Sequence, residues 1–422
     1  MPKPNAKNNR RRAVITGLGV IAPNGIGKEA FWNALREGKS GIAKLTRFDV
    51  STYNSQIAGE VNDFDPTDYM SPKSARRMDR FTQFAVAAAR MALDDSRLII
   101  NEKNNKKIGV VIGTALAGMP HAEFQHSIFM EKGLKWIDPL LATRLFGGEA
   151  SSHISIEFGT RGPCHTISTA CAAGTDSIGY ALTLIRNDIA DIFITGGTEA
   201  PLAPMTVGSF CKLGALSQRN GDPTKACCPF DKKRDGFVIS EGGGVIILEE
   251  LEHALGRNAK VYAEIIGYGA SSEAFHMTRA SDDSRGFVDA ISSALQDAEV
   301  TADEIEYINA HGTSTPPNDK SETLAIKKVF GPRAYDIPIS ATKSMTGHSI
   351  GGNGAMEVIA SALTIENNFI HPTINYETPD PECDLNYVPN KGIKATVDLI
   401  LSNSAGFGSR NSALIIERYR EK

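Results

Sequence analysis

The sequence predicts an α/β protein made of two similar halves, each rich in β-α-β units, whose glycine-rich strand ends face one shared crevice. Short apolar β runs alternate with amphipathic helical segments along the whole chain. The pattern of the first half also recurs in the second, where 295–310 corresponds to 91–113 and 339–365 corresponds to 167–185. Because this period is far longer than a solenoid repeat, we interpret it as a domain duplication. The expected halves are 1–258 and 259–422.

Composition excludes several classes of protein. The chain has 422 residues, 41% hydrophobic and 22% charged, with a net charge of −4 that supplies no global field for nucleic acid or an anionic membrane. Six cysteines without a C-x-x-C pair predict a reducing compartment and no zinc or iron–sulfur site. The basic segment 1–12 leads into no apolar signal core, and no apolar run is long enough for a bilayer. We expect a cytoplasmic protein with no membrane insertion, no nucleic-acid partner and no metal site.

The first half begins with a β run over 12–23 that we expect to enter a glycine turn. This run superficially fits a dinucleotide-binding fingerprint, but Pro23 and Asn24 would break the helix that receives the pyrophosphate, so a tight strand-end turn is favoured. Further along, Ser71-Pro72 starts a helical segment. The remaining elements predicted in this half are helices over 31–37, 81–94 and 251–257, strands over 107–113 and 190–199, an apolar, partly irregular insertion over 118–158, and two β runs around a glycine turn at 242–244.

The second half repeats this arrangement. We expect strands over 259–268, 305–310 and 337–342, helices over 285–297, 323–330 and 354–367, and a closing pair of strands over 399–404 and 413–418. For the insertion 118–158, core packing is the default, and a pocket lining or a subunit contact is the alternative.

Cys171 is the first candidate for chemistry. A β-prone run over 165–169 reaches a cluster of small residues and then an apolar helical pattern over 178–185, which places Cys171 at a strand-to-helix turn. Backbone N–H groups and the helix dipole favour a thiolate at such a turn, and the same N–H groups can hold an oxyanion. The alternative is a buried cysteine that acts as a small hydrophobic residue, the commoner role of a free cysteine.

Four more polar or aromatic residues follow predicted strands. His311 follows the strand over 305–310, Lys343 and His348 follow the strand over 337–342, and Phe407 lies in a glycine-flanked turn after 399–404. One thiol, two histidines and a lysine suit acyl transfer on a thioester, in which the thiolate takes the acyl group and histidine N–H groups stabilise an enolate or oxyanion. Each residue alone has an ordinary structural alternative. Their shared placement at strand ends favours a site.

The segments around these residues resemble the signatures of a known family. They read Thr-Ala-Cys-Ala-Ala-Gly-Thr at 169–175, Asn-Ala-His-Gly-Thr-Ser-Thr at 309–315, Thr-Lys-Ser-Met-Thr-Gly-His at 342–348 and Ser-Ala-Gly-Phe-Gly at 404–408. Together they resemble the β-ketoacyl-[acyl-carrier-protein] synthases, above all the type II condensing enzymes of bacterial fatty acid synthesis, and the similarity extends over about 12–419. The resemblance implies a thiolase-type fold with duplicated αβαβα layers in two pseudo-symmetric halves, and a homodimer with active sites near the subunit interface.

The resemblance also implies roles for the site residues. Cys171 would accept the acyl group, and the backbone N–H groups of Cys171 and Phe407 would form the oxyanion hole. His311 and His348 would assist the decarboxylation of malonyl-ACP and stabilise the enolate, which attacks the acyl thioester to give 3-oxoacyl-ACP, CO2 and free ACP. Lys343 would sit near His311 and be held by Glu322.

Substrate contacts follow in the same way. Thr313 and Thr315 would bind the 4′-phosphopantetheine arm of the acyl carrier protein, Leu116 would bound the acyl pocket, and Phe407 would also act as its gate. No other cofactor is implied, although some relatives bind a monovalent cation. In the family, one segment meets the acidic carrier protein, and in this chain that segment contains a basic cluster of Lys73, Arg76 and Arg77. The alternative interpretation of this cluster is a solvated basic face without a partner.

Three segments depart from the family pattern. Ser409 and Arg410 follow the gate, Ser-Ile-Gly-Gly-Asn-Gly follows His348 in place of the more usual Leu-Leu-Gly-Ala-Ala-Gly, and the pocket turn 114–118 reads Thr-Ala-Leu-Ala-Gly. These changes leave open a ketosynthase of a specialised type II polyketide, aryl polyene or glycolipid pathway, paired with a chain-length factor as a heterodimer. A non-catalytic chain-length factor is disfavoured by Cys171 and the two histidines. The Gly-Phe-Gly gate disfavours a degradative thiolase, and a serine hydrolase would need a G-x-S-x-G elbow, which the sequence lacks.

Overall fold

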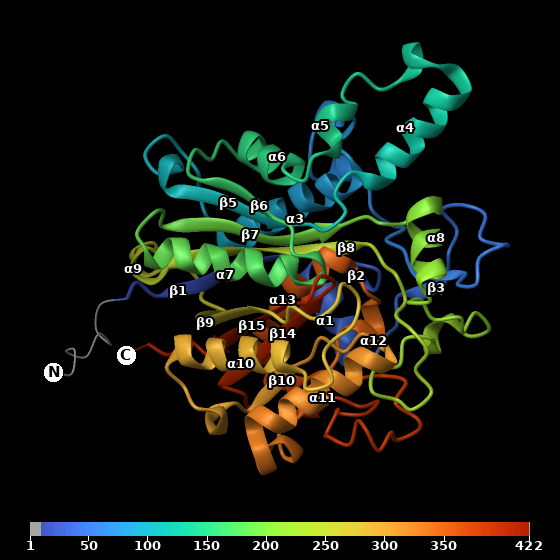
Figure 1. Cartoon of the computed structure of the whole chain (residues 1–422). Coiled ribbons are helices and arrows are strands. Elements are labelled where there is room, and N and C mark those ends of the chain that lie inside the picture. The colour runs from blue at the N-terminus through green and yellow to red at the C-terminus, as the bar shows by residue number, and fades with distance from the viewer. Residues whose placement is uncertain (1–9, 422) are drawn as a thin grey trace.

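The computed structural model describes residues 10–421, and the basic segment 1–9 lies outside these residues (Figure 1). Its largest sheet has the strand order β11-β10-β14-β15-β9-β1-β8-β7-β5-β6, with β2 paired to β1. The strands of the first half are β1 (Ala13–Ala22), β2 (Gly25–Ile26), β5 (Ile108–Gly113), β6 (Cys164–Ile167), β7 (Ile192–Glu199) and β8 (Gly242–Glu250). Those of the second half are β9 (Ala263–Ser272), β10 (Tyr307–Asn309), β11 (Ile339–Ser340), β14 (Leu399–Gly406) and β15 (Arg410–Glu417).

The two halves have the same strand pattern. In the first, β5 pairs in parallel with β6 and β7, and β7, β8 and β1 continue antiparallel. In the second, β10 pairs in parallel with β11 and β14, and β14, β15 and β9 continue antiparallel. The halves meet where β1 pairs with β9. The equivalences β6–β11 and β5–β10 are those that the sequence repeat predicted, and β7 and β14 correspond in the same way.

Helices complete a five-layered structure (Figure 1). Helices α3 (Arg80–Ser96) and α6 (Glu149–Phe158) cover the outer face of the first half, and α10 (Arg285–Ala298) and α11 (Pro316–Phe330) cover that of the second. Between the two sets of strands lie α7 (Ala173–Arg186) and α13 (Asn353–Asn367). Helix α13 is buried from Asn353 through Ile365, as its apolar sequence predicts. The αβαβα arrangement is therefore confirmed.

The other elements lie around these layers. The helices are α1 (Lys28–Glu37), α2 (Pro72–Ala75), α4 (Met119–Lys132), α5 (Leu141–Leu145), α8 (Pro204–Leu213), α9 (Leu251–Gly256) and α12 (Lys343–Thr346). Two small antiparallel sheets join β3 (Ile42–Lys44) to β4 (Ile57–Gly59) and β12 (Phe369–Ile370) to β13 (Ile393–Lys394). Ser71 caps α2, as its Ser-Pro start predicted. No helix within 10–421 combines the length and the apolar character needed to cross a bilayer.

The β run over 12–23 ends in the expected tight turn, at Pro23 and Asn24, after which β2 pairs back on β1. Gly19 lies inside β1, where a Cβ would lie 1.9 Å from the Ala88 carbonyl oxygen of the helix packed on it. The glycine turn predicted at 242–244 is instead the start of β8, and a Cβ at Gly243 would lie 2.1 Å from the Gly197 carbonyl oxygen. These glycines permit close packing of backbones rather than a reversal of the chain.

The insertion 118–158 is mostly helical, and much of its apolar surface is exposed. Helices α4 and α5 project from the body of the molecule, with α8 beside them (Figure 1). Leu134 is 77% exposed and Trp136 is 62% exposed, so core packing was the wrong default for this segment. The exposed apolar residues of this lobe are Phe124, Phe129, Met130, Leu134, Trp136, Leu140, Leu145 and Phe146.

Candidate active site

The equivalent strands of the two halves deliver the candidate residues. Cys171 lies in a 3-10 turn (Ala170–Ala172) between β6 and α7, and Lys343 follows β11, the equivalent strand of the second half. His311 follows β10, and Phe407 follows β14. Because the carboxyl ends of parallel strands lie at one edge of a sheet, this topology gathers the nucleophile and the charged groups.

Cys171 is held in a strained and buried turn. It is 9% exposed, and Ala170 before it has a φ of 52°, a left-handed conformation that is costly for a residue with a Cβ. The backbone N–H groups of Phe407 and of Cys171 itself both lie where they act to lower the pKa of the thiol. Gly406 permits this approach, since a Cβ there would lie 3.0 Å from the Cys171 nitrogen. The two N–H groups expected to form an oxyanion hole therefore converge at the nucleophile.

The pKa of the Cys171 thiol runs against the expectation that its turn favours a thiolate. Burial raises its pKa to about 12, although the positive charge of Lys343 and the N–H group of Phe407 act in the opposite direction. Loss of hydration outweighs the local dipole because the turn lies inside the protein. Acylation of this thiol therefore requires a proton acceptor.

Lys343 is completely buried and forms an ion pair with Glu357 of α13, not with the expected Glu322. Its ammonium also donates to Nδ1 of His311 at 3.2 Å and to the His311 carbonyl oxygen at 2.7 Å. Glu322 instead accepts the backbone N–H groups of His311 and Gly312 at 2.7 and 2.8 Å, and it holds the turn that carries His311. Lys343 does lie beside His311, but the acidic partner was wrong.

The two histidines lie together and are neutral. Their ring centroids are 5.6 Å apart, with an angle of 87° between the rings. Burial and the positive charge of Lys343 lower the pKa of His311 well below its usual value and that of His348 to about 3. Phe237 packs edge-on against His348 at 5.1 Å, and it belongs to the same buried apolar cluster as Cys171.

The residues expected to contact substrate lie on turns around this centre. The hydroxyl groups of Thr313 and Thr315 are 2.8 Å apart, on the turn after His311. Leu116 is half-buried on the turn after β5, whose backbone N–H groups donate to buried Glu199. Sequence reasoning missed Glu199 and Glu357 as site residues. Neither lies in one of the four segments that resemble the family signatures, and only the packing reveals their partners.

The basic cluster is exposed on α2 and the turn after it. The side chains of Lys73, Arg76 and Arg77 are all exposed, and no ion pair to them occurs within residues 10–421. Arg144 of α5 donates to the backbone carbonyl groups of Arg76 and Arg77, which places a fourth cation beside the cluster. This surface presents localised positive charge on a protein with a negative net charge.

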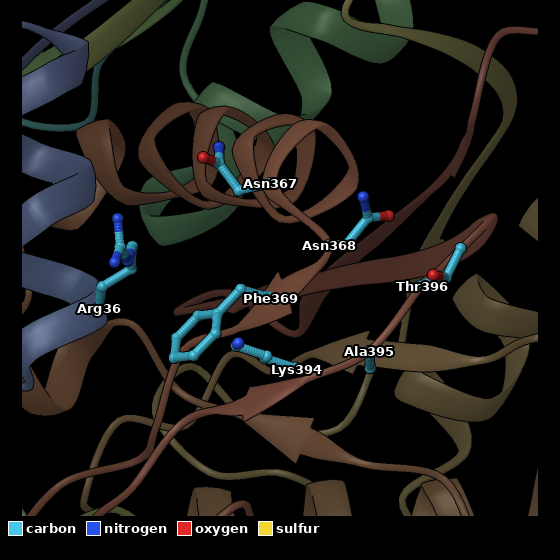
Figure 2. A pocket seen from close by; sticks show the side chains of 7 residues that line it. All are labelled: Arg36, Asn367, Asn368, Phe369, Lys394, Ala395 and Thr396. Carbon is cyan, nitrogen blue, oxygen red and sulfur yellow. The ribbon is translucent and has the colours of Figure 1, made fainter.

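Two cavities lie outside the catalytic cluster. One, of about 570 Å³, borders the nucleophile turn at Thr169 and the gate turn at Gly408 and Arg410. The other, of about 460 Å³, is shown in Figure 2 beside Phe369 and Arg36. It lies at the C-terminal end of α13, whereas His348 lies just before the N-terminal end. The helix between the two ends is about 20 Å long, so this cavity is remote from the candidate residues. Within residues 10–421 no cluster of three or more His, Cys, Asp or Glu side chains is suited to a metal ion.

Comparison with known proteins agrees with this geometry. Residues 10–254 match the N-terminal domain of β-ketoacyl synthases, and residues 262–377 match the C-terminal domain. The chain belongs to the β-ketoacyl synthase family. Among curated members, it is 46% identical to 3-oxoacyl-[acyl-carrier-protein] synthase 2 of Synechocystis sp., over 98% of this chain and 100% of that protein. It is 46% identical to the protein of the same name from Coxiella burnetii, over 97% and 99%.

Solved structures of this family also match. A type II polyketide ketosynthase, determined with its acyl carrier protein and bound to the hexaketide, is 39% identical, with a TM-score of 0.90 over 97% of this chain and 100% of that chain. The ishigamide ketosynthase/chain length factor matches at 39% identity and a TM-score of 0.91 over the same shares. The thiolase-type fold of these ketosynthases is thus the fold of this chain, and the predicted family and fold class are both confirmed.

Proposed function

We propose that this β-ketoacyl synthase elongates acyl chains in fatty acid biosynthesis by decarboxylative Claisen condensation of an acyl group on Cys171 with malonyl-ACP. The observation that supports this most strongly is the convergence of the Phe407 and Cys171 N–H groups on the Cys171 sulfur, beside the Lys343 and histidine cluster. Donors fixed where negative charge develops are the main means by which enzymes accelerate acyl transfer.

In the first step, the Cys171 sulfur attacks the acyl thioester, and the thiol of the carrier protein's arm leaves. The two N–H groups stabilise the tetrahedral oxyanion, and their removal typically costs about 10²–10³ in kcat per donor. In the second step, the carboxylate of malonyl-ACP leaves as CO2, and its electron pair forms an enolate that attacks the acyl carbonyl. The C–S bond to Cys171 then breaks, one proton is taken up and 3-oxoacyl-ACP is released. Neutral His311 and His348 assist decarboxylation and enolate formation.

The carrier protein enters through its charge and its arm. The exposed cations at 73–77 face an acidic partner, and Thr313 and Thr315 bind the 4′-phosphopantetheine arm as it reaches Cys171. Leu116 bounds the acyl pocket, and Phe407, half-buried on its glycine-flanked turn, gates it. Glu357 Oε2 and Asn403 Oδ1 are buried oxygen atoms with no hydrogen-bond partner within 10–421, and oxygen atoms of this kind are the ligands that a monovalent cation would take.

The second candidate function is that of a ketosynthase in a specialised type II pathway. It is favoured by the similarity to solved polyketide ketosynthases, one of them determined with a chain length factor. Arg410 lines a cavity beside the turn that carries Phe407, where a charged side chain suits a polar acyl chain better than a saturated one.

Assembly and location follow from the surface and the cysteines. The lobe of α4 and α5 exposes eight large apolar side chains, and because exposed apolar patches mark interaction sites, we propose that a second subunit covers it. An identical subunit is the first choice, and a chain-length factor is the alternative.

All six cysteines are free, as suits the cytosol. The boundary between the two halves is proposed at 258/259, between α9 and β9.

The test is intact-mass spectrometry after incubation with a panel of acyl-ACPs and then with malonyl-ACP. The expected result is an acyl adduct on the wild type but not on Cys171→Ala, discharged by malonyl-ACP to a 3-oxoacyl-ACP two carbons longer. Adducts that form equally on Cys171→Ala would refute the mechanism. Acylation only by functionalised acyl chains, or only with a partner subunit, would favour the specialised pathway.

A further inference from the structure

We propose that Asn353 is a positioning residue that fixes His348 as the proton acceptor of the site, whereas Lys343 fixes His311 as a hydrogen-bond donor. This inference rests on the proposed function and narrows it, since it assigns His348 to the acylation step and leaves the enolate to His311. It concerns a position where the family more usually has alanine and this chain has asparagine.

The orientation of the Asn353 amide is determined by its neighbours. Its Oδ1 accepts the backbone N–H of Ser349 and, at 3.2 Å, the Ser349 hydroxyl. Its Nδ2 donates to the Gly347 carbonyl oxygen at 3.5 Å. A backbone N–H only donates, and a carbonyl oxygen only accepts, so each amide atom has one consistent identity. Asn353 is completely buried, and water therefore does not compete for these bonds.

The same Oδ1 lies 2.9 Å from Nδ1 of His348. Because an amide oxygen only accepts, Nδ1 of the neutral imidazole must carry the proton, and Nε2 is left with a lone pair. The backbone of His348 is fixed as well, since its N–H donates to the Val238 carbonyl oxygen at 2.7 Å and its carbonyl oxygen accepts the Ser240 N–H. The ring therefore keeps both its place and its tautomer.

His311 has the opposite tautomer. The ammonium group of Lys343 has only donors, so Nδ1 of His311 accepts from it and the proton lies on Nε2. Within residues 10–421, no hydrogen bond reaches Nε2 of either ring. The site thus presents one free N–H donor, on His311, and one free imidazole lone pair, on His348.

An imidazole lone pair is what the acylation step needs. The buried Cys171 is a thiol, and its S–H bond must break as the sulfur forms its bond to the acyl carbon. Nε2 of His348 takes this proton and passes it to the thiolate that leaves on the carrier's arm, so the histidine returns to its neutral form. His311, which keeps its N–H, remains the donor to the enolate oxygen in the next step.

Three variants separate this role from a structural one. Asn353→Ala removes the acceptor and restores the residue that the family more usually has. Asn353→Asp keeps an acceptor at Nδ1, and Ser349→Ala is the matched control, because it removes a hydrogen bond to the same oxygen without touching the imidazole. Two rates are measured between pH 5 and 9: single-turnover acylation by acyl-ACP, and decarboxylation of malonyl-ACP without an acyl donor. Ring ¹⁵N NMR of histidine-labelled protein, assigned with His348→Gln, reports the tautomers directly.

We expect the wild-type His348 to be protonated on Nδ1 and Asn353→Ala to lose this preference. Acylation by Asn353→Ala should slow by about tenfold or more, the range lost with a general base, while decarboxylation changes by less than about threefold. Asn353→Asp should keep the tautomer and move the acid limb of acylation to higher pH, because its carboxylate favours the imidazolium. Ser349→Ala should stay within about twofold of the wild type.

An Nε2-protonated His348 in the wild type would overturn the proposal, and so would acylation by Asn353→Ala within about twofold of wild type. An equal loss of acylation and decarboxylation would mark a structural role and would also overturn it. If Asn353→Ala fails to fold, the wild-type tautomer and the pH profile of Asn353→Asp decide. Wild-type protein that is not acylated at all would refute the proposed function, and the NMR measurement would still test the tautomer.

Discussion

Replacing Lys343 with methionine tests the most buried charge pair of the site. The side chains of Lys343 and Glu357 are both 0% exposed, and the ammonium group contacts the carboxylate directly. Removing one partner of such a pair strands the other charge in a medium of low dielectric constant, which costs about 3–5 kcal/mol. Replacing both partners by neutral groups of similar shape avoids this cost. Lys343→Met and Glu357→Gln should therefore each lower the free energy of unfolding by about 3–5 kcal/mol at pH 7, and the double variant should lose much less than the sum.

Urea unfolding of the wild type, the two single variants and the double variant measures this coupling. The matched control is Glu322→Gln combined with Lys343→Met, whose effects should add, because Glu322 is bonded to backbone N–H groups and not to the ammonium. A loss below about 1 kcal/mol for Lys343→Met would refute the reasoning. Coupling to Glu322 in place of Glu357 would refute it too, and would restore the pairing that the sequence suggested.

The same variant has a pH signature. The folded-state pKa values of His311 and His348 lie below the unfolded value, so their contribution to stability is present above pH 6.5 and is lost as the pH falls. Each histidine adds a slope of up to about 1.4 kcal/mol per pH unit in this range. Lys343→Met removes a charge that lowers both pKa values, and the loss of stability between pH 6.5 and 5 should therefore become shallower than in the wild type.

Three further outcomes are expected. Gly406→Ala should reduce kcat about 10²-fold in folded protein. Its Cβ would lie 2.9 Å from the Thr169 carbonyl oxygen and would push the two N–H groups of the proposed oxyanion hole apart. Near-normal steady-state kinetics would contradict this. The rate of alkylation of Cys171 by iodoacetamide should rise about tenfold per pH unit from pH 7 to 9 without a plateau, because burial raises the thiol pKa to about 12. A plateau near pH 7 would indicate a stable thiolate instead. Arg76→Glu combined with Arg77→Glu should raise KM for acyl-ACP at low salt, with little change in kcat; an unchanged KM would place carrier docking elsewhere.

The sequence was most informative where chemistry and topology meet. Cys171, His311 and Lys343 each follow a recognisable β run, and the structure places Cys171 and Lys343 after the equivalent strands β6 and β11, and His311 after β10. The duplication itself was readable because both halves repeat the same order of strands and helices over long distances. Local patterns therefore sufficed to place the turns, since turns follow directly from the ends of strands.

The sequence was least informative where the outcome depends on burial or on distant packing. Glu322 and Glu357 are both acidic residues on helices, and only the course of α13 through the centre decides which of them meets Lys343. The helix-end dipole at Cys171 was evident, but the loss of hydration that outweighs it appears only in three dimensions. Gly243 looked like a turn because its reason for being glycine, the Gly197 carbonyl oxygen of the neighbouring strand, lies more than forty residues away.

The duplicated fold explains why the site needs both halves. Cys171 follows β6 and Lys343 follows β11, so equivalent positions hold the nucleophile in one half and the charge that tunes it in the other. The turn after β5 carries apolar Leu116, whereas the turn after β10 carries His311. In the proposed mechanism, the first half therefore supplies the thiol and the pocket wall, and the second supplies the proton-handling groups and the Phe407 N–H. Because the two N–H groups beside the sulfur come from different halves, any movement between the halves would alter the proposed oxyanion hole directly. The pairing of β1 with β9 and the burial of α13 between the two sets of strands hold that distance fixed.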